Sequence, residues 1–370
     1  MKIIHLASGD LWAGAEVQLF HLALRLAQIE GVTLLVVLLN PGQLETELKK
    51  FGVNVRVLNE TSLSSFAIFW KFNRILRDFK PEVVHTHRTK ENVIGGLAAK
   101  LNGIKSIRTV HGASEFAFNP VNFRRFIFAG IDRLVGNLFQ QRIIAVSDEL
   151  KQKLQKYYPK SKLVVINNCV DVAYIEKKSK EQCNIPIDPQ SFNIAFVGRF
   201  VPVKRVDLFY DIAKATILAN PKKDIQFYMF GDGPLQEDIK RKIAADVLSE
   251  RILLHGFVPN TAPVIKQMNL LMFTSDHEGM PMTLLEAMVL GVPVLSRNLT
   301  TIRSVLCQGK CGYILKSDDI LEYVDLIKSL VVDSEDARKR AALAKMEVRN
   351  AYSIENNVKQ YLRLYKELVP

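Results

Sequence analysis

The segment Ser275–Ser296 combines residue types that could hold a phosphorylated ligand. It reads SDHEGMPMTLLEAMVLGVPVLS, so Glu278 lies in a loop bent by glycine and proline, before a helix that we expect to begin near Thr283. The first N–H groups of such a helix carry a partial positive charge, and the backbones of Met282 and Thr283 can donate to a diphosphate there. Thr283 and Glu286 also have the T-x-x-E spacing of a capping box, which gives Glu286 a structural explanation that Glu278 lacks.

The run Phe196–Lys204 (FVGRFVPVK) supplies two cations, Arg199 and Lys204, directly after a strand-like sequence. Ligands of parallel sheets bind outside the carboxyl ends of the strands, which is where these side chains should lie. Two cations at that edge suit an anion whose negative charge increases as a bond breaks. The turn Gly231–Pro234 (GDGP) follows another strand-like run and needs no function of its own.

Three histidines also follow strand-like runs. His85 and His87 end one run, and His111, followed by glycine, ends the next. Three histidines suggest zinc, but no carboxylate or cysteine accompanies them at ligand spacing, so we expect neither a metal site nor a cofactor. We interpret His85 and His87 as ordinary hydrogen-bonding residues and His111 as the better site candidate. The first loop, Ser8–Glu16, lacks G-x-G-x-x-G, which disfavours a hydride-transfer enzyme.

Short runs rich in Val, Ile and Leu alternate with segments of helical periodicity along most of the chain. Strands that are apolar on both faces and separated by helices indicate parallel sheets covered on both sides, and six or seven strands twice over indicate two doubly wound α/β domains. The predicted strands are 2–7, 33–39, 53–58, 82–86, 107–110, 142–146 and 163–166 in the first half, and 193–197, 225–230, 252–255, 270–274, 293–296 and 312–315 in the second.

The polar, lysine-rich stretch Val172–Phe192 separates the two sets of strands and predicts the domain boundary. We therefore expect an N-terminal domain at residues 1–180 and a C-terminal domain at residues 181–353. Residues 354–370 form a final helix, with Tyr361 and Tyr365 on one face and no strand following.

The charge of the chain is concentrated in its first half. Residues 1–180 carry 26 Lys and Arg against 15 Asp and Glu, whereas residues 181–370 are almost balanced. This asymmetry points to an anionic partner for the first half, either a nucleic acid or a membrane surface. The longest apolar run without a charged residue, Val32–Leu39, is far too short to span a bilayer. The four cysteines form no C-x-x-C pair, so we expect a soluble protein of the cytoplasm.

Two segments of the first half mix basic and aromatic residues. Such helices suit the headgroup region of an anionic bilayer, although an ordinary surface has the same composition. In Val121–Arg142 we expect a core stripe that includes Leu134 and Leu138, beside a second stripe of basic and large apolar residues. The candidate membrane or acceptor residues are Trp70, Arg74, Arg124, Phe128 and Phe139. No nucleic-acid-binding motif accompanies the charge.

Taken in order, the motifs resemble a known family. They are G-A-E near the start, H-G after a middle strand, V-G-R with a following lysine, G-D-G-P, H-G-F, and E-G-M-P with a second glutamate eight residues on. This order is similar to that of the retaining, nucleotide-sugar-dependent glycosyltransferases of the family-4 or group 1 type. The resemblance implies the GT-B fold, in which two Rossmann-like domains face each other across a cleft and the last helix crosses back to the first domain.

The resemblance assigns roles to residues that would bind the donor. It implies that Glu278, with the backbone amides of Gly279–Met280, holds hydroxyls of the sugar. It further implies that Glu286 accepts hydrogen bonds from the ribose and that Gly256–Phe257 lies against the base.

The resemblance also assigns residues to the diphosphate and the reacting carbon. Arg199 and Lys204 would neutralise the leaving group, Gly14 would let the first loop approach it, and His111 would lie beside the anomeric carbon. Arg205 stands where a glycine is frequent in the family, so the geometry of its loop is open.

The resulting expectation is a retaining transferase that moves a hexose from a nucleoside-diphosphate sugar, with UDP preferred over GDP. The acceptor would be a glycan or a lipid-linked molecule, bound by the first domain on the cytoplasmic face of a membrane, as in lipopolysaccharide or capsule synthesis. Two alternatives stay open: a nucleotide-sugar epimerase on the same fold, and a basic module that binds nucleic acid without catalysis.

Overall fold

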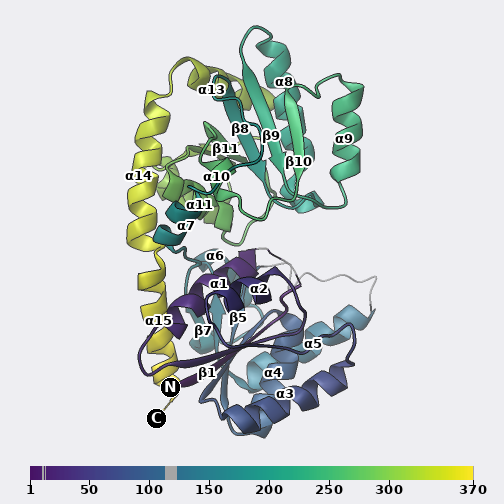
Figure 1. The fold of residues 1–370 in the computed structure, drawn as a ribbon, viewed down its shortest axis with the longest axis vertical. Helices are drawn as coiled ribbons and strands as arrows, with labels where there is room; N and C mark the ends of the chain where they lie inside the picture. Colours follow the sequence, from purple (N-terminus) through teal and green to yellow (C-terminus); the bar gives the residue numbers. More distant parts are fainter. Residues whose placement is uncertain (11, 13, 113–122, 370) are drawn as a thin grey trace. The chain divides into compact units, whose positions relative to one another are not determined.

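The computed structural model describes residues 1–10, 12, 14–112 and 123–369, with the side chains of residues 123–127 outside the description. The chain divides into two compact units (Figure 1). Unit 1 comprises Met1–Cys169 and Ile354–Pro370, and unit 2 comprises Val170–Ser353.

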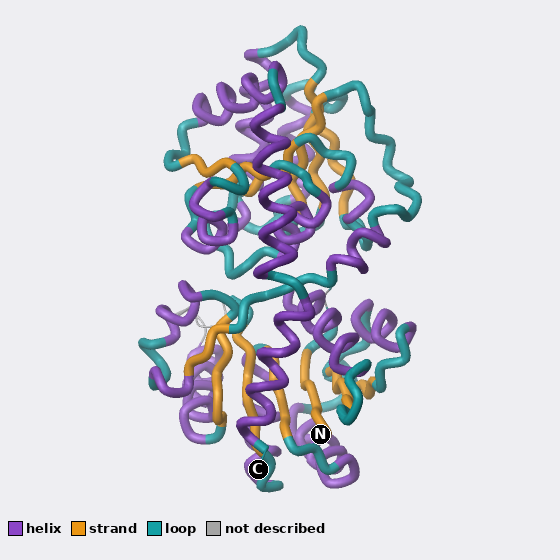
Figure 2. The backbone as a smooth tube through the Cα atoms, turned by 90° about the vertical axis from the view of Figure 1, so that its left-hand side faces the viewer, coloured by secondary structure: helices purple, strands orange, loops and turns teal. Residues whose placement is uncertain are grey.

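Unit 1 is built on a sheet whose described strands are all parallel, in the order β3-β2-β1-β4-β5-β6-β7. Helices lie on both sides of this sheet (Figure 2), so strands such as β4 are buried along their whole length. The strands are β1 (Lys2–Ala7), β2 (Thr33–Leu38), β3 (Val55–Val57), β4 (Val83–His87), β5 (Lys105–Val110), β6 (Gln140–Ala145) and β7 (Leu163–Val165). The helices are α1 (Gly14–Ala27), α2 (Gln43–Lys50), α3 (Ser65–Phe79), α4 (Thr89–Leu101), α5 (Phe123–Leu138), α6 (Asp148–Leu154), α15 (Ile354–Leu368) and the turn η2 (Lys160–Lys162).

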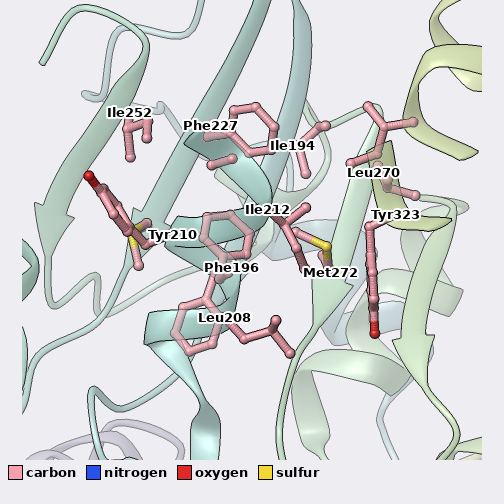
Figure 3. Close-up of a cluster of buried hydrophobic side chains, with 14 of the residues drawn as sticks. Ile194, Phe196, Leu208, Tyr210, Ile212, Phe227, Ile252, Leu270, Met272 and Tyr323 are labelled. Atoms are coloured by element: carbon pink, nitrogen blue, oxygen red, sulfur yellow. The ribbon is translucent and has the colours of Figure 1, made fainter. Parts of the chain in front are cut away.

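Unit 2 contains a second parallel sheet, in the order β10-β9-β8-β11-β12-β13. A hydrophobic core of unit 2 lies between this sheet and a covering helix. In it, Phe196 and Phe227 of the sheet pack with Ile212 of the helix (Figure 3). The strands are β8 (Phe192–Val197), β9 (Ile225–Phe230), β10 (Ile252–Gly256), β11 (Leu270–Phe273), β12 (Val294–Arg297) and β13 (Tyr313–Leu315). The helices are α7 (Val172–Lys178), η3 (Pro202–Lys204), α8 (Val206–Ala219), α9 (Gln236–Ala245), α10 (Ala262–Ile265), α11 (Met282–Leu290), α12 (Thr300–Val305), η4 (Cys307–Gly309), α13 (Ile320–Val332) and α14 (Glu335–Ala351).

The predicted fold class, two doubly wound α/β domains, is confirmed. Every predicted strand is present, and the strand ends differ from the prediction by no more than about two residues. In both sheets the strand order reverses beside the first strand of the unit, β1 or β8, which is the topological switch point where such folds bind ligands.

The boundary between the units lies at Cys169–Val170 rather than after residue 180. The Val170 N–H donates to the carbonyl of Tyr352 at 2.9 Å, and α7 packs against α10 and α11. These contacts place residues 170–180 in unit 2, although their polar, lysine-rich sequence is typical of a linker. The last helix, α15, belongs to unit 1, where Asn357 Nδ2 donates to the carbonyl of Asn167 at 2.6 Å.

Candidate functional site

The loops that follow β8, β9 and β10 are hydrogen-bonded to one another at the carboxyl edge of the unit 2 sheet. The Gly198 N–H donates to Phe230 O at 2.9 Å, and the Gly231 N–H donates to Gly256 O at 2.7 Å. A Cβ atom on Gly231, whose φ is +136°, would lie 1.9 Å from Gly198 O. The G-D-G-P turn is therefore a packing element that supports the loop carrying Arg199.

We expect Gly231→Ala to lower the free energy of unfolding by about 3 kcal/mol, because it combines backbone strain with overpacking. Gly291→Ala is the matched control. Gly291 also has positive φ in unit 2, but its added Cβ meets only a side-chain carbon of Lys345 at 3.9 Å, so about 1 kcal/mol should be lost. Urea denaturation measures both, and equal losses would contradict the packing role.

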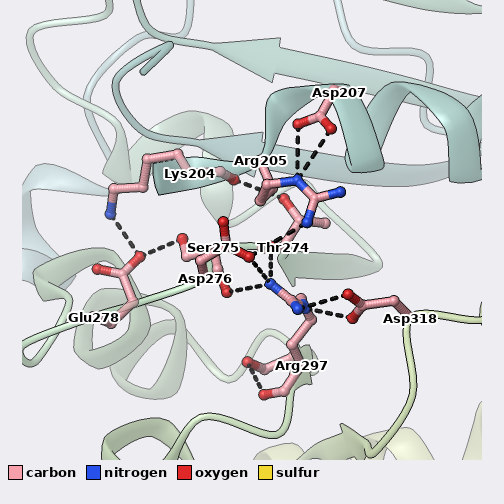
Figure 4. Close-up of polar contacts among 10 residues, drawn as sticks. Lys204, Arg205, Asp207, Thr274, Ser275, Asp276, Glu278, Arg297 and Asp318 are labelled. Carbon is pink, nitrogen blue, oxygen red and sulfur yellow. Dashed lines mark hydrogen bonds and ion pairs between the residues drawn. The ribbon is translucent and has the colours of Figure 1, made fainter. Parts of the chain in front are cut away.

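The centre of the candidate site is the carboxylate of Glu278, between β11 and α11. Lys204 Nζ and Ser275 Oγ both donate to Glu278 Oε1 at 2.6 Å (Figure 4). Glu278 is only 8% exposed, so its charge is held by these two donors rather than by water. In the described part of the chain both of these hydrogen bonds fall on Oε1, so Oε2 has the capacity to accept a further one.

Two hydrogen bonds to backbone carbonyls hold the loops of Lys204 and Glu278 together. Thr274 Oγ1 donates to the carbonyl of Lys204 at 3.0 Å, and the Asp276 N–H donates to the carbonyl of Val203 at 2.8 Å. The sequence predicted Lys204 and Glu278 separately, 74 residues apart. The structure brings them into one ion pair.

A network of arginines and aspartates braces the Glu278 loop, and sequence reasoning missed it. Arg297 binds Asp318 through two bonds of 2.6 and 2.7 Å, donates to Ser275 O at 3.1 Å, and pairs with Asp276 (Figure 4). Arg297 is the last residue of β12. The principle that indicated Arg199, that ligands bind outside the carboxyl ends of parallel strands, would therefore have identified it as well. Burial opposes ionisation of Asp276, but hydrogen bonds from Arg297 and Arg205 hold the pKa of its carboxyl below the ordinary value.

Arg205 adopts a left-handed conformation, with φ of +47° and ψ of +52°, between η3 and α8. Glycine adopts this conformation without steric strain, which explains why glycine is frequent at this position in similar proteins. The Arg205 side chain binds Asp207 at 3.0 Å and Asp276 at 3.3 Å, so the arginine ties the loop after β8 to the loop after β11.

The predicted capping box at the start of α11 is wrong. The helix begins at Met282 with Pro281 as its N-cap, and no side chain caps it. Glu286 instead accepts a hydrogen bond from Thr261 Oγ1 at 3.1 Å. Thr283 lies inside the first turn, too late to cap, because the helix starts at Met282, two residues earlier than a cap at Thr283 would require. The Leu284 N–H donates to the carbonyl of Pro281 at 3.2 Å, whereas the N–H groups of Met282 and Thr283 precede the first carbonyl that the helix itself could offer them.

Burial raises the pKa of Glu286 from 4.5 to about 6, with the Thr261 hydrogen bond opposing the shift. The folded state therefore favours the protonated carboxyl. Its stabilising contribution, about 2 kcal/mol, is fully present below pH 4.5 and is lost as the pH rises through 6. We expect Glu286→Gln to remove this loss, so the difference in unfolding free energy between variant and wild type should grow between pH 4.5 and 7. A pH-independent difference, measured by denaturant titration, would contradict the shifted pKa.

The other predicted residues of unit 2 lie along the same sheet edge. Arg199 is exposed in the loop after β8, while Met280 is buried just before α11. Gly256 ends β10 with φ of +68°, and Phe257 follows it with 49% of its surface exposed. An aromatic ring held out from a strand end can stack on a planar ligand group.

The predicted site residues of unit 1 are Gly14 and His111. Gly14 is the exposed first residue of α1, and the nearby Glu16 is buried in an ion pair with Arg88. His111 follows β5, and its Nε2 lies 3.0 Å from His87 Nδ1. Burial lowers the pKa of His111 to about 3, with the cations Arg88 and Arg108 adding to the effect, so its ring is neutral at pH 7.

The predicted core stripe of α5 is wrong at Leu134 and Leu138, which are 57% and 62% exposed. The buried face of the helix instead carries Asp132, which pairs with the fully buried Arg108 at 2.8 Å, so this internal ion pair fixes which side faces inward. Phe139 is partly buried rather than on an exposed stripe.

The remaining candidate acceptor residues are exposed where they are described. Trp70 and Arg74 lie on the outer side of α3, and Phe128 lies on α5. The side chain of Arg124 is outside the described residues. Within the described chain, no helix has the length and apolar character needed to cross a bilayer.

Two family models match this chain. The model described as Glycosyltransferase Family 4 matches residues 12–174, and the model described as Glycosyl transferases group 1 matches residues 177–346. Together the two models account for nearly the whole chain.

Similar proteins of known name span most of the chain. The UDP-Gal:alpha-D-GlcNAc-diphosphoundecaprenol alpha-1,3-galactosyltransferase of Escherichia coli is 26% identical, over 88% of this chain and 86% of the relative. The N-acetyl-alpha-D-glucosaminyl L-malate synthase of Bacillus anthracis is 24% identical, over 78% and 75%. The crystal structure of Anabaena Alr3699/HepE in complex with UDP-glucose superimposes with a TM-score of 0.82 at 18% identity, covering 99% of this chain and 100% of that one, which establishes a shared fold.

Proposed function

This chain belongs to the group 1 glycosyltransferases, which transfer a sugar from a nucleotide-sugar donor, and we propose that it is a retaining enzyme that moves a hexose from UDP to a glycan or lipid-linked acceptor. The observation that carries the donor site is the Lys204–Glu278 pair beside the N-terminus of α11. A cation, a carboxylate and the first N–H groups of a helix thus lie at one sheet edge.

The proposed chemistry is stabilisation of the leaving group. When the bond between the anomeric carbon and the diphosphate oxygen breaks, its electrons go to the oxygen. Lys204, Arg199 and the first N–H groups of α11 would stabilise that charge. The acceptor hydroxyl would attack from the face that the diphosphate leaves and pass its proton to the departing diphosphate oxygen, which retains the configuration. We assign no covalent nucleophile or metal.

In the same proposal, the remaining predicted residues hold the donor. Glu278 Oε2 would accept from a sugar hydroxyl, and Glu286 would accept from the ribose. Phe257 would lie against the base, and His111 of unit 1 would contact the sugar. UDP as the nucleotide is supported by the UDP-Gal in the name of the E. coli relative and by the UDP-glucose in the Anabaena structure.

The acceptor that we propose is lipid-linked and reached at the cytoplasmic face of an anionic membrane, in the synthesis of a cell-surface polysaccharide. The E. coli relative is named for a diphosphoundecaprenol-linked acceptor. In this chain α4 packs against both α3 and α5, and those two helices expose large apolar side chains in the half that carries the excess of basic residues. The exposed apolar side chains are Phe66 and Trp70 on α3 and Phe128, Ile131, Leu134 and Leu138 on α5.

Vesicle cosedimentation tests the membrane proposal. We expect binding to vesicles that contain phosphatidylglycerol, weaker binding in high salt, and little binding to pure phosphatidylcholine. The double variant Trp70→Glu/Leu138→Glu should lose most of the binding. Leu321→Glu, which changes a similarly exposed leucine of α13 in unit 2, is the control and should bind as wild type. Equal binding by both variants would contradict the proposal and favour a soluble acceptor such as that of the Bacillus relative.

The donor is tested by thermal shift with UDP, GDP and ADP, each alone and as common sugar conjugates. A ligand at about 100 times its Kd adds roughly 2.7 kcal/mol of apparent stability. We expect UDP and one UDP-hexose to give the largest shifts, and the transfer product to keep the anomeric configuration of that donor. A shift with GDP alone would overturn the choice of nucleotide, and isomerisation of the donor without an acceptor would favour the epimerase.

A further inference from the structure

Four histidines form a cluster in unit 1, three of them buried (His5, His85 and His87) and His111 partly buried. His5 lies in β1, His85 and His87 lie in β4, and His111 follows β5; these are neighbouring strands, and His5 and His85 are paired in register. His85 and His87 are two residues apart and so lie on the same face of the sheet. The ring centroid of His87 lies 4.5 Å from that of His85, 5.2 Å from that of His5 and 5.3 Å from that of His111.

The cluster is linked by hydrogen bonds into a continuous chain that also includes Tyr365 of α15. The hydroxyl of Tyr365 lies between His85 and His5, so the last helix of the unit completes the connection. The successive contacts are Thr109 Oγ1 to His85 Nε2 at 2.7 Å, His85 Nδ1 to Tyr365 Oη at 2.7 Å, Tyr365 Oη to His5 Nε2 at 3.1 Å, His5 Nδ1 to His87 Nε2 at 3.0 Å, and His87 Nδ1 to His111 Nε2 at 3.0 Å.

All four rings are neutral at pH 7. Burial lowers the pKa of His5 to about 3, as it does for His111, and holds the pKa values of His85 and His87 well below the ordinary value. A neutral imidazole has one N–H donor and one acceptor nitrogen. Each histidine inside the hydrogen-bonded series must therefore donate to one neighbour and accept from the other. If Tyr365 Oη accepted from both His85 and His5, its own buried proton would lose these two acceptors, so the hydroxyl is expected to donate to one histidine and accept from the other.

The ring nitrogens that form each hydrogen bond predict which tautomers of the histidines can coexist. His85, His5 and His87 each use Nε2 on the Thr109 side of the chain and Nδ1 on the His111 side. Donation toward His111 puts every proton on Nδ1, and donation toward Thr109 puts every proton on Nε2. A histidine in the other tautomer would set two N–H groups or two lone pairs against each other, or at Tyr365 would leave the hydroxyl proton without one of these acceptors. Either costs about as much as leaving a buried polar group unsatisfied.

We propose that His5, His85, His87 and Tyr365 are positioning residues that fix the tautomer of His111 by forcing all four histidines into the same tautomer. The part of this proposal that concerns catalysis rests on the proposed function, in which His111 contacts the donor sugar. The tautomer decides whether His111 presents a donor or an acceptor at each nitrogen, and so which ligand group it can bind.

Metal binding is the competing explanation, because the nitrogens of His5, His85 and His87 lie within 4.8 Å of one another. However, the ring nitrogens of these three histidines already form hydrogen bonds with one another, with Tyr365, with Thr109 or with His111. The cluster found among the described residues contains no carboxylate to offset the charge of a buried dication. A metal would also require a lone pair from each ligand, which the chain of hydrogen bonds uses up.

The test is ¹⁵N NMR of the protein labelled at histidine, at pH 7. Couplings of each ring nitrogen to the carbon-bound ring protons show which nitrogen carries the proton. The signals of His21, His255 and His277, the other histidines of the sequence, are identified by replacing each in turn. We expect four neutral rings in one shared tautomer. A mixture of tautomers, a charged ring among the four, or stoichiometric zinc binding that His85→Ala abolishes would overturn the proposal.

Tyr365→Phe removes only the hydroxyl that links the two parts of the chain. In this variant His5, His87 and His111 should still share a tautomer, whereas His85 becomes independent of them. Tyr361→Phe is the matched control, because Tyr361 lies on the same helix, is equally buried and packs on His85 with ring centroids 5.7 Å apart, while its hydroxyl is bonded to Thr109 instead. It should keep one shared tautomer. Identical spectra from the two variants would contradict the role of Tyr365.

Measurements of transfer activity distinguish a failure of this proposal from a failure of the proposed function. If the tautomer preference of His111 depends on Tyr365, the fraction of productive molecules falls in Tyr365→Phe, and kcat should fall about twofold or more at unchanged donor KM. Unchanged kcat with uncoupled tautomers would overturn the positioning role. Full activity of His111→Ala would instead overturn the catalytic assignment of His111 and leave the NMR result on the shared tautomer intact.

Discussion

Lys204→Met is expected to lower kcat about 100- to 1000-fold, the usual loss when one charge-stabilising donor is removed from a developing oxyanion. The lysine is held at 2.6 Å from Glu278, on a loop that the hydroxyl of Thr274 ties to the neighbouring one, so it would be preorganised for the diphosphate that we propose to bind at the N-terminus of α11. Steady-state transfer with the best donor from the thermal-shift screen measures the effect.

Two further variants separate the charge of Lys204 from its structural role. Lys204→Met leaves Glu278 buried with one partner fewer, whereas Lys204→Met/Glu278→Gln removes both charges and should recover stability without recovering turnover. Lys214→Met removes a lysine of unit 2 that pairs with Asp246 at the surface, and it should leave kcat unchanged. A kcat for Lys204→Met within tenfold of wild type would contradict the role of Lys204 in stabilising the leaving group.

Glu278→Ala is expected to weaken binding of the nucleotide sugar by about tenfold or more while hardly changing the affinity for free UDP. The reason is that its carboxylate would accept from a hydroxyl of the sugar, and a hydrogen bond to a charged group contributes about 1.5–3 kcal/mol. Isothermal titration with UDP and with the UDP-sugar gives the two affinities.

Glu286→Ala provides the contrast, because it should weaken UDP and the UDP-sugar equally if Glu286 accepts from the ribose. The effect should be measured at pH 7, above the raised pKa of about 6, where the wild-type carboxyl is ionised. A Glu278→Ala variant that loses affinity for UDP as strongly as for the UDP-sugar would contradict its assignment to the sugar.

The sequence by itself determined the elements and most of the motifs. Strands buried on both faces must be nearly continuous runs of Val, Ile and Leu, and the helices between them must alternate, so local composition was sufficient to predict both sheets. The strand-end rule then indicated Lys204, Glu278 and His111 from positions that depend only on neighbouring residues.

The tertiary structure decided how residues far apart in the sequence pair. Periodicity could not show which stripe of α5 faces inward, because the deciding contact is the buried pair of Asp132 with Arg108 from β5. Nor could the T-x-x-E spacing show that Glu286 accepts a hydrogen bond from Thr261 instead of capping its own helix.

The histidine chain shows the same division. The residue types at positions 5, 85, 87 and 111 are plain in the sequence, and each alone has an ordinary explanation. Only the register of β1, β4 and β5 and the docking of α15 bring their nitrogens and the hydroxyl of Tyr365 to hydrogen-bond distance. Local patterns are set by neighbours along the chain, whereas a shared network of protons depends on contacts that folding alone creates.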